Sequence, residues 1–361
     1  MSDPVVQPPP SWDKLRSLPL VDWHPVSQLK VPQTSVLRTS VPAVDVHNHL
    51  GRWLSHGEWM IDNVPELLAT MDGTGIETIV NLDGMWDEEV SANVTRYDAA
   101  YPGRFLTFCQ LDWAQVGAEC GAARLRASLD DSAARGARGV KVWKNLGLTV
   151  RDTTGDLVMP DDPRVVDVMR HAGVLGLPVL IHTADPIAFF EPLDSHNERL
   201  DELLVSQDLW FGDRAVHPSF DRLLDAHAAL VLACPDTMFI GAHAGGAAEH
   251  LDRVSALLDI APNYTIDTAG RMAELGRQPR RFAAFVAQHP DRVLFGTDVY
   301  PASAEQFRLH ARFLETLDEA FMYTPDEPVP PQGRWTVSGL GLAPDLLGAV
   351  YRDNAARVLG L

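Results

Sequence analysis

Val44-Asp45-Val46-His47-Asn48-His49-Leu50 is the stretch around which the rest of the chain is organised. It reads as a short β-strand with apolar Val44 and Val46, and it ends in His-x-His. Because side chains alternate between the two faces of a strand, we expect His47 and His49 to point the same way, one pleat apart. Two neutral imidazoles placed in this way can begin a zinc, iron or manganese site. Two surface histidines at a strand end would give the same pattern, so the residues downstream must decide.

Strand-like and helix-like segments alternate from Ala43 onward. The expected strands are residues 43–49, 76–82, 105–111, 139–144, 178–182, 238–243, 264–267 and 292–298. A helical segment follows each strand, and such alternation requires a parallel sheet. Eight β–α units in 361 residues favour an α/β fold closed into a (β/α)8 barrel, or TIM barrel. An open, doubly wound sheet is the alternative.

The barrel is expected to carry three additions. Residues 1–42 are proline-rich and lack periodicity, so we interpret them as an N-terminal extension, with Pro8-Pro9-Pro10 extended. The barrel then takes residues 43–361. A long insertion rich in acidic, aromatic and proline residues follows the fifth strand, over about 183–217, and should sit over the barrel mouth. A C-terminal helical tail ends the chain, with its last helix over 344–359.

The net charge of −19 restricts the partners of the chain. A strongly acidic protein repels nucleic acid and anionic membranes, so we expect neither as a partner. We expect a small-molecule substrate and a homodimer or higher homo-oligomer. The segment 274–281 is basic within this acidic chain and is a candidate for binding either substrate or a neighbouring subunit.

The cellular compartment is expected to be the cytoplasm. The three cysteines are few and widely spaced, which fits a reducing compartment and suggests neither a disulfide framework nor a cysteine-based zinc cluster. The first residues lack the basic and apolar regions of a signal peptide. No run of about 18 apolar residues is present, so we expect no membrane-spanning segment.

Reactive side chains recur at the carboxyl ends of the expected strands. Lys141 and Lys144 lie near the end of the fourth strand, His182 ends the fifth, His243 the sixth and Asp298 the eighth. In a (β/α)8 barrel these strand ends form the face that carries the active site. One buried histidine is ordinary packing, but convergence of this many metal-competent residues indicates a shared site.

The same positions carry a resemblance to the amidohydrolase superfamily, in its amidohydrolase-related branch of barrel hydrolases and decarboxylases. The matching motifs run in family order over roughly residues 43–300. They are Asp45-Val46-His47-Asn48-His49, Gly139-Val140-Lys141-Val142, Val179-Leu180-Ile181-His182, Gly241-Ala242-His243-Ala244-Gly245-Gly246 and Gly296-Thr297-Asp298. The closing helix with Asn354-Ala355-Ala356-Arg357-Val358-Leu359 is also typical of the branch.

The resemblance implies a metal cage and two catalytic residues. His47, His49, His182 and Asp298 would hold one divalent metal, with zinc as the first expectation and manganese or iron as alternatives. Asp298 would also take a proton from the metal-bound water. His243 would act as an acid/base and orienting group, or as a ligand of a second metal.

The two strand-4 lysines bear on the number of metals. In two-metal relatives a lysine on this strand is carboxylated and bridges the metals. Lys141 and Lys144 are three residues apart, about 10 Å along a strand, so only one can approach the centre. We favour a single metal, with an uncarboxylated lysine holding a carboxylate or carbonyl of the substrate. A salt bridge or a solvated rim charge is the alternative for either lysine.

Three further residues are candidates for substrate contact. Phe189 and Phe190 in the insertion could stack on a ring or close a lid, or could equally form a small core under a long loop. Arg271, just past the seventh strand, could grip an anionic substrate bidentately. Its alternative is a salt bridge to Asp267 or Glu274.

Two reactions suit these residues. The first expectation is a metal-dependent hydrolase that attacks a small ester, lactone or amide with a metal-activated water. The alternative is a metal-dependent, non-oxidative decarboxylase of a small aromatic or unsaturated carboxylic acid. Similar decarboxylases tend to have a proline-containing turn after the sixth strand, whereas residues 247–251 here are expected to continue straight into a helix, which favours the hydrolase. A non-catalytic barrel is disfavoured because no metal ligand is missing.

Overall fold

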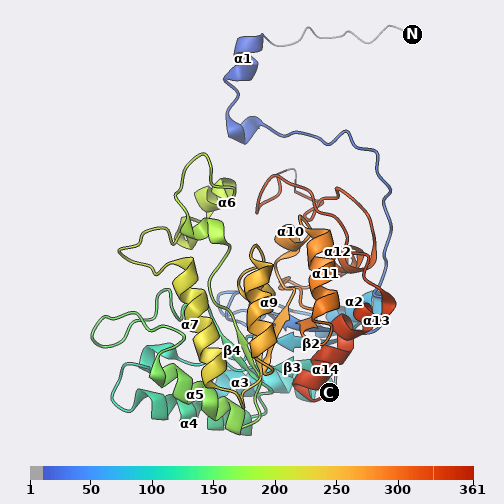
Figure 1. Cartoon of the computed structure of the whole chain (residues 1–361). Helices are drawn as coiled ribbons and strands as arrows, with labels where there is room; N and C mark the ends of the chain where they lie inside the picture. The colour runs from blue at the N-terminus through green and yellow to red at the C-terminus, as the bar shows by residue number, and fades with distance from the viewer. Residues whose placement is uncertain (1–10, 328) are drawn as a thin grey trace.

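The computed structural model describes residues 11–327 and 329–361, so the Pro8–Pro10 run lies outside the described residues. Eight parallel strands form the centre of the molecule (Figure 1). They are β1 (Ala43–Asn48), β2 (Ile76–Asn81), β3 (Phe105–Thr107), β4 (Val140–Val142), β5 (Val179–Ile181), β6 (Phe239–Gly241), β7 (Tyr264–Asp267) and β8 (Val293–Leu294). Neighbours in sequence pair with one another, within one group from β1 to β3 and another from β4 to β8.

Backbone contacts at two seams close the two groups of strands into a barrel. Cys109, just past β3, forms a parallel bridge with Val140 of β4. On the other side, the backbone N of Asp298, just past β8, donates to the carbonyl of His47 in β1 at 2.8 Å. Because both seams are joined, the sheet has no open edge, and the expected TIM barrel is confirmed rather than the doubly wound sheet.

Helices surround the strands and alternate with them along the chain (Figure 1). The outer helices are α2 (Val64–Thr74), α3 (Glu88–Val94), α4 (Gly121–Ala134), α5 (Pro163–Val174), α7 (Phe220–Ala233), α9 (Leu251–Ile260), α11 (Pro279–Gln288) and α12 (Ala304–Glu315). Several begin at side-chain caps, as at Ser219, whose hydroxyl accepts from the backbone N of Arg222. No helix in the described part of the chain is long and apolar enough to cross a membrane.

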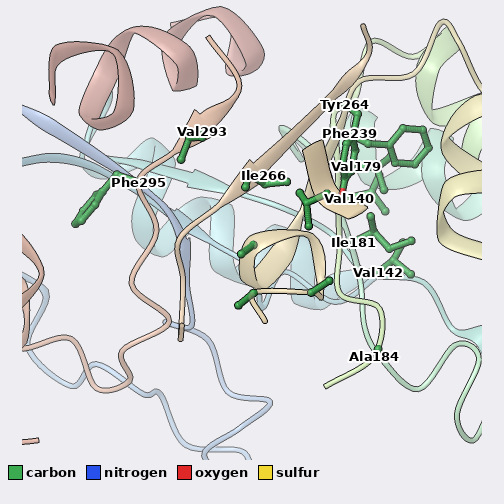
Figure 2. Close-up of a cluster of buried hydrophobic side chains, with 14 of the residues drawn as sticks. Val140, Val142, Val179, Ile181, Ala184, Phe239, Tyr264, Ile266, Val293 and Phe295 are labelled. Atoms are coloured by element: carbon green, nitrogen blue, oxygen red, sulfur yellow. The ribbon is translucent and has the colours of Figure 1, made fainter. Parts of the chain in front are cut away.

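Side chains of the short strands are buried on both faces, as parallel strands in a barrel require. Val179 and Ile181 of β5 belong to the apolar layer between strands and helices, part of which Figure 2 shows. Leu180, between them, belongs to a second cluster inside the barrel. Residues of α14 (Asn354–Leu359), including Ala355, join that inner cluster. The C-terminal tail therefore contributes to the barrel core.

Several strands are shorter than the sequence predicts. We expected β3 to reach Leu111 and β8 to span 292–298, but β3 ends at Thr107 and β8 holds only Val293–Leu294. Beyond β8 the backbone N of Phe295 donates to Val350 instead of to a neighbouring strand. The apolar sequence continues past the last hydrogen-bonded strand residue because the following residues are also buried. Burial alone does not distinguish a strand from a buried loop.

Two segments lie outside the repeating β–α pattern. The arm 11–42 contains α1 (Trp12–Arg16) and a 3₁₀ turn, η1 (Leu20–Asp22), and runs along the outside of the barrel (Figure 1). The insertion after β5 contains a 3₁₀ turn, η4 (Ile187–Phe190), and the short helix α6 (Leu200–Val205). A buried ion pair between Arg199 and Glu274 fastens this insertion to the segment after β7.

Candidate metal centre and substrate cavity

Three side chains from different strand ends converge at the carboxyl end of the barrel. His47 in β1, His243 just past β6 and Asp298 just past β8 place ligand-type atoms within 4.8 Å of one another. The ring of His182, just past β5, lies 4.2 Å from that of His243 between centroids. The strand-end residues that the sequence singled out therefore lie close together. The three whose ligand-type atoms lie within 4.8 Å of one another include His243, which was expected to be an acid/base group or a ligand of a second metal.

Buried carboxylates fix the orientation of the two β1 histidines. The Nδ1 atom of His47 hydrogen-bonds Asp267 at 2.8 Å, and that of His49 hydrogen-bonds Asp83 at 2.7 Å. These contacts direct both Nε2 atoms toward Asp298 Oδ1, which lies 3.7 Å from His47 and 3.4 Å from His49. A carboxylate behind an imidazole fixes its tautomer and raises its basicity, as in many metal sites.

The backbone around the site is strained. Ala184, His243 and Asp298 follow β5, β6 and β8, and all three have positive φ, at 63°, 60° and 57°. Such conformations cost about 1–3 kcal/mol each for non-glycine residues and concentrate at functional sites. Gly270, also at positive φ, lies so close that an added Cβ would stand 3.3 Å from both Asp298 Oδ2 and His243 Nδ1. The strained turns let side chains at strand ends reach the barrel axis.

Unpartnered buried atoms test whether a metal fits. His49 Nε2, both ring nitrogens of His182 and Asp298 Oδ1 are buried and make no hydrogen bond of good geometry, although His49 Nε2 lies 3.4 Å from Asp298 Oδ1 and His182 Nε2 lies 3.4 Å from Asp185 Oδ1. Such groups are rare in folded proteins because each loses its interactions with water. Imidazole nitrogens and a carboxylate oxygen are also ligands that zinc and manganese accept. The donor set therefore fits a divalent cation.

Without a metal, the site residues shift one another's pKa values because they are buried close together. Burial opposes protonation of His49, yet Asp83 and Asp298 outweigh it and raise the pKa of His49 to about 9. Burial opposes ionisation of Asp298, but His47 and His49 hold its pKa well below the ordinary value. Burial also lowers the pKa of His182 to about 4, so that its ring is neutral. In this form a proton on His49 supplies positive charge between the two carboxylates.

The side chains of the two strand-4 lysines point to different places, as their spacing predicts. Lys141 is buried, and its Nζ atom lies 3.3 Å from His47 Nε2. Burial lowers the pKa of Lys141 to about 8, although the nearby Asp298 works against that shift. Lys144 turns away and pairs with Asp185 in the insertion, with Nζ and Oδ2 2.6 Å apart. Lys141 is therefore the lysine at the centre.

Arg271 contacts the insertion, and the two insertion phenylalanines pack beneath it. Arg271 approaches Asp185, with Nη2 and Oδ1 3.8 Å apart, rather than the expected Asp267 or Glu274. Phe189 and Phe190 are both 3% exposed and belong to the apolar core under the insertion. This placement departs from stacking on a substrate ring and matches the alternative, a small core under a long loop.

A cavity of about 380 Å³ opens beside the metal-competent group. Lys141 and Trp143 are part of its lining, and Trp143 also stands edge-on to His49, with ring centroids 5.7 Å apart. Trp53 packs edge-on against Trp143, with ring centroids 4.7 Å apart, and Arg151 and Asp112 line the cavity as well. The lining thus combines aromatic rings with two basic side chains, Lys141 and Arg151, and one acidic side chain. Of the five residues predicted to contact substrate, Lys141 lines this cavity.

Sequence reasoning missed Asp83, Asp267 and the tryptophans. Asp83 follows β2 and Asp267 ends β7, so both carry the same signal, a polar residue at a strand end, that singled out the histidines. Trp53 and Trp143 follow β1 and β4 at short distances. No local pattern distinguishes a cavity-lining tryptophan from one in the core.

A model of the amidohydrolase family matches residues 44–361. The chain belongs to the amidohydrolase family. This membership places it among enzymes built on the barrel described above, and the resemblance seen in the motifs is confirmed. No curated protein matches the sequence.

Solved structures share the amidohydrolase barrel at low sequence identity. A 2,6-dihydroxybenzoate decarboxylase from Rhizobium has a TM-score of 0.53 and 16% identity, over 89% of this chain and 99% of that one. A dihydroxybenzoic acid decarboxylase from Polaromonas, solved with manganese and the inhibitor 2-nitroresorcinol, gives 0.53 and 15%, over 89% and 97%. An uncharacterised TIM-barrel protein from Bordetella bronchiseptica gives 0.55 and 15%, over 89% and 99%. These similarities show a shared fold.

Changing Asp267 or Asp83 to asparagine should weaken metal binding about 10–100-fold, because the imidazole would lose the carboxylate that orients it. The native protein, prepared without chelator, should carry about one equivalent of zinc or manganese. Elemental analysis and chelator competition measure both quantities. Asp291→Asn, at an exposed residue paired with Arg292, is the control and should bind metal normally. Unchanged affinity in both site variants would contradict the orienting role.

Proposed function

We propose that this amidohydrolase-family protein is a metal-dependent, non-oxidative decarboxylase of a small aromatic carboxylic acid. The observation that carries the proposal is the tryptophan-lined cavity that includes Lys141, whose Nζ atom lies 3.3 Å from His47 Nε2. An arene can pack against the tryptophan side of this cavity, and its acid group can meet the buried ammonium. The dihydroxybenzoate decarboxylases that share the fold support the same reaction class.

In this proposal His47, His49, His182 and Asp298 hold a single divalent cation. The buried atoms of His49, His182 and Asp298 that lack a good hydrogen bond support this set. His47 belongs to it because a carboxylate, Asp267, orients its ring in the same way as Asp83 orients the ring of His49. Zinc and manganese both accept these ligands. When bound, the cation would polarise the oxygen atoms of the acid.

Lys141 and the tryptophans position the substrate. The Lys141 ammonium can donate to a carboxylate or a ring oxygen, and such charge-assisted bonds contribute about 1.5–3 kcal/mol. Trp53 and Trp143 offer faces and edges to an arene, and aromatic pairs contribute about 0.5–1.5 kcal/mol beyond the burial of area. Both contacts favour a flat anion over an aliphatic one.

His243 handles the proton. Its Nδ1 atom hydrogen-bonds the carbonyl of Ala269 at 2.8 Å, so Nε2 is the nitrogen left for exchange. Burial holds the pKa of His243 well below the ordinary value, so the ring gives up a proton readily once it has received one. His243 Nε2 takes this proton from solvent water and passes it to the ring carbon that bears the carboxylate. The bond from that ring carbon to the carboxylate carbon then breaks, its electron pair restores the aromatic ring, and carbon dioxide leaves.

The structure changes one part of the sequence argument against a decarboxylase. We expected residues 247–251 to continue from β6 into a helix, but α9 begins only at Leu251. His243 and the three residues after it all have positive φ, from 56° to 74°, and a right-handed helix cannot pass through them. A turn therefore follows β6, but residues 242–251 hold no proline, so only the helix part of the argument for the hydrolase is removed.

Hydrolysis of a small ester, lactone or amide is the second candidate. The observation that favours it is Asp298, a buried carboxylate kept ionised beside His49. A carboxylate in this position can accept a proton from a water molecule during attack on a carbonyl. The site residues are the same, so the reaction product must decide.

Isotope labelling separates the two reactions. Metal-loaded protein is incubated with dihydroxybenzoates and, separately, with lactones and esters of similar size, in water enriched in heavy oxygen or in deuterium. We expect carbon dioxide release and one solvent-derived deuterium on the ring carbon, with no heavy oxygen in the organic product. Incorporation of one heavy oxygen per turnover without release of carbon dioxide would show that the protein is a hydrolase instead.

A further inference from the structure

The arm 11–42 exposes apolar side chains far more densely than the rest of the described chain. Nine of the nineteen large apolar side chains that are exposed fall within 26 residues of the arm: Trp12, Leu15, Leu18, Leu20, Val21, Trp23, Val26, Leu29 and Leu37. Single exposed apolar residues are ordinary, but a group of this size marks an interaction surface. The arm therefore requires a partner surface.

Polar contacts tether the arm to its own barrel and leave these side chains outside. The backbone N and the hydroxyl of Thr34 donate to Asp318 at 2.6 and 2.7 Å. Arg334 donates to the carbonyl of Leu20 at 3.0 Å and to that of Trp23. Figure 1 shows α1 at the far end of the arm, apart from the barrel. The path of the arm is fixed while its apolar side chains gain little burial.

The charge of the arm is opposite to that of the chain. Residues 11–42 carry four basic and two acidic side chains, whereas the whole chain has a net charge of −19. The rest of another copy is therefore strongly acidic and attracts this arm, which favours a second copy over a basic partner. The arm also has the size that a specific interface needs, roughly 20–30 residues a side.

A groove lined by both apolar and polar side chains, Arg334 among them, lies where the arm meets the C-terminal tail. Trp23 and Val26 of the arm line a groove of about 450 Å³ with Met322 and Trp335 of the tail. In a two-fold dimer the same patch serves both subunits, so one groove can receive the arm of the other copy while giving its own. This self-complementarity is what reciprocal exchange requires.

We propose that the arm is the interface between two copies of this chain, each seating its arm on the groove and acidic surface of the other. The interface lies beside the insertion after β5, because Arg334 also pairs with Asp201 of α6, with Nε and Oδ2 2.6 Å apart. Burying the exposed tryptophans, leucines and valines supplies the main driving force, at about 25 cal/mol per Å² of apolar area.

Light scattering on the full chain tests this proposal. The triple variant Trp12→Ser, Val21→Ser and Val26→Ser removes side chains that are 77%, 71% and 79% exposed. The matched control is Val174→Ser, Leu232→Ser and Ile260→Ser, at residues that are 81%, 47% and 63% exposed on outer helices of the barrel, away from the arm. We expect the native chain and the control to have the mass of a dimer, and the arm variant to have that of a monomer at equal concentration.

Two outcomes would overturn the arm interface. A native chain that stays monomeric at every concentration removes the second copy as the occupant. An arm variant that keeps the mass of the native oligomer shows that another surface joins the subunits. Circular dichroism must show native secondary structure in both variants, and the arm lies outside the metal centre, so its loss should leave metal content unchanged.

Discussion

Asp298→Asn should abolish turnover, with a loss of about 10²–10⁴-fold in kcat, while the fold stays intact. The carboxylate Oδ1 lies within 3.7 Å of the Nε2 atoms of both His47 and His49. An amide has neither the charge to complete a cation site nor the capacity to accept a proton. Steady-state kinetics on metal-loaded protein, with elemental analysis of the same sample, measures the effect.

The control for this variant is Asp291→Asn, because Asp291 is exposed and pairs only with its neighbour Arg292 in the described structure. It should keep native activity and metal content. The Asp298 variant should keep native circular dichroism. If that variant retained more than a few per cent of native activity, Asp298 would have only a structural role.

Lys141→Met should lower kcat/KM by about 10–100-fold without destabilising the fold. The ammonium that we assign to the substrate acid would be lost, at about 1.5–3 kcal/mol. Yet Lys141 is buried, and burial already lowers its pKa to about 8, so its charge is costly to keep. Replacing a buried charge by an apolar side chain of similar volume is often neutral or stabilising, by up to about 4 kcal/mol. Kinetics and denaturant unfolding measure the two effects.

Lys144→Met is the matched comparison and should act in the opposite way. Lys144 pairs with the buried Asp185, so its removal leaves a carboxylate with less compensation. We expect a loss of about 1–3 kcal/mol in unfolding free energy. Activity should fall less than in Lys141→Met. Equal effects of the two substitutions on kcat/KM would contradict the assignment of substrate binding to Lys141.

Much of the fold could be predicted because its signals are local. Apolar strands such as Val179–Ile181 alternate with amphipathic helices, and eight such units favour a barrel. The ends of strands were less well predicted. At β8 burial continues past the hydrogen-bonded ladder, so hydrophobicity overstates the length of the strand.

The sequence predicted that the candidate site residues would converge, but it did not predict their arrangement. His47, His182, His243 and Asp298 lie near or just past the ends of strands, and strand ends meet on one face of a barrel. The turn after β6 was missed although Gly245 and Gly246, which disfavour a helix, directly precede Ala247. What stops the helix is the left-handed backbone at His243, held in part by Asp267, whose Oδ1 accepts from the backbone N of His243 at 2.7 Å.

The sequence by itself determined the order of the elements, the residues at each strand end and the family motifs. These depend on periodicity and residue type, which are properties of neighbouring positions. Tertiary structure alone decided that Asp267 backs His47, that Asp83 backs His49, and that Trp53 packs edge-on against Trp143 in the lining of a cavity. The first contact joins residues 220 positions apart, and it forms only when the barrel closes. Closure brings β7 beside β8 and β8 beside β1, and no local pattern records which side chains then meet.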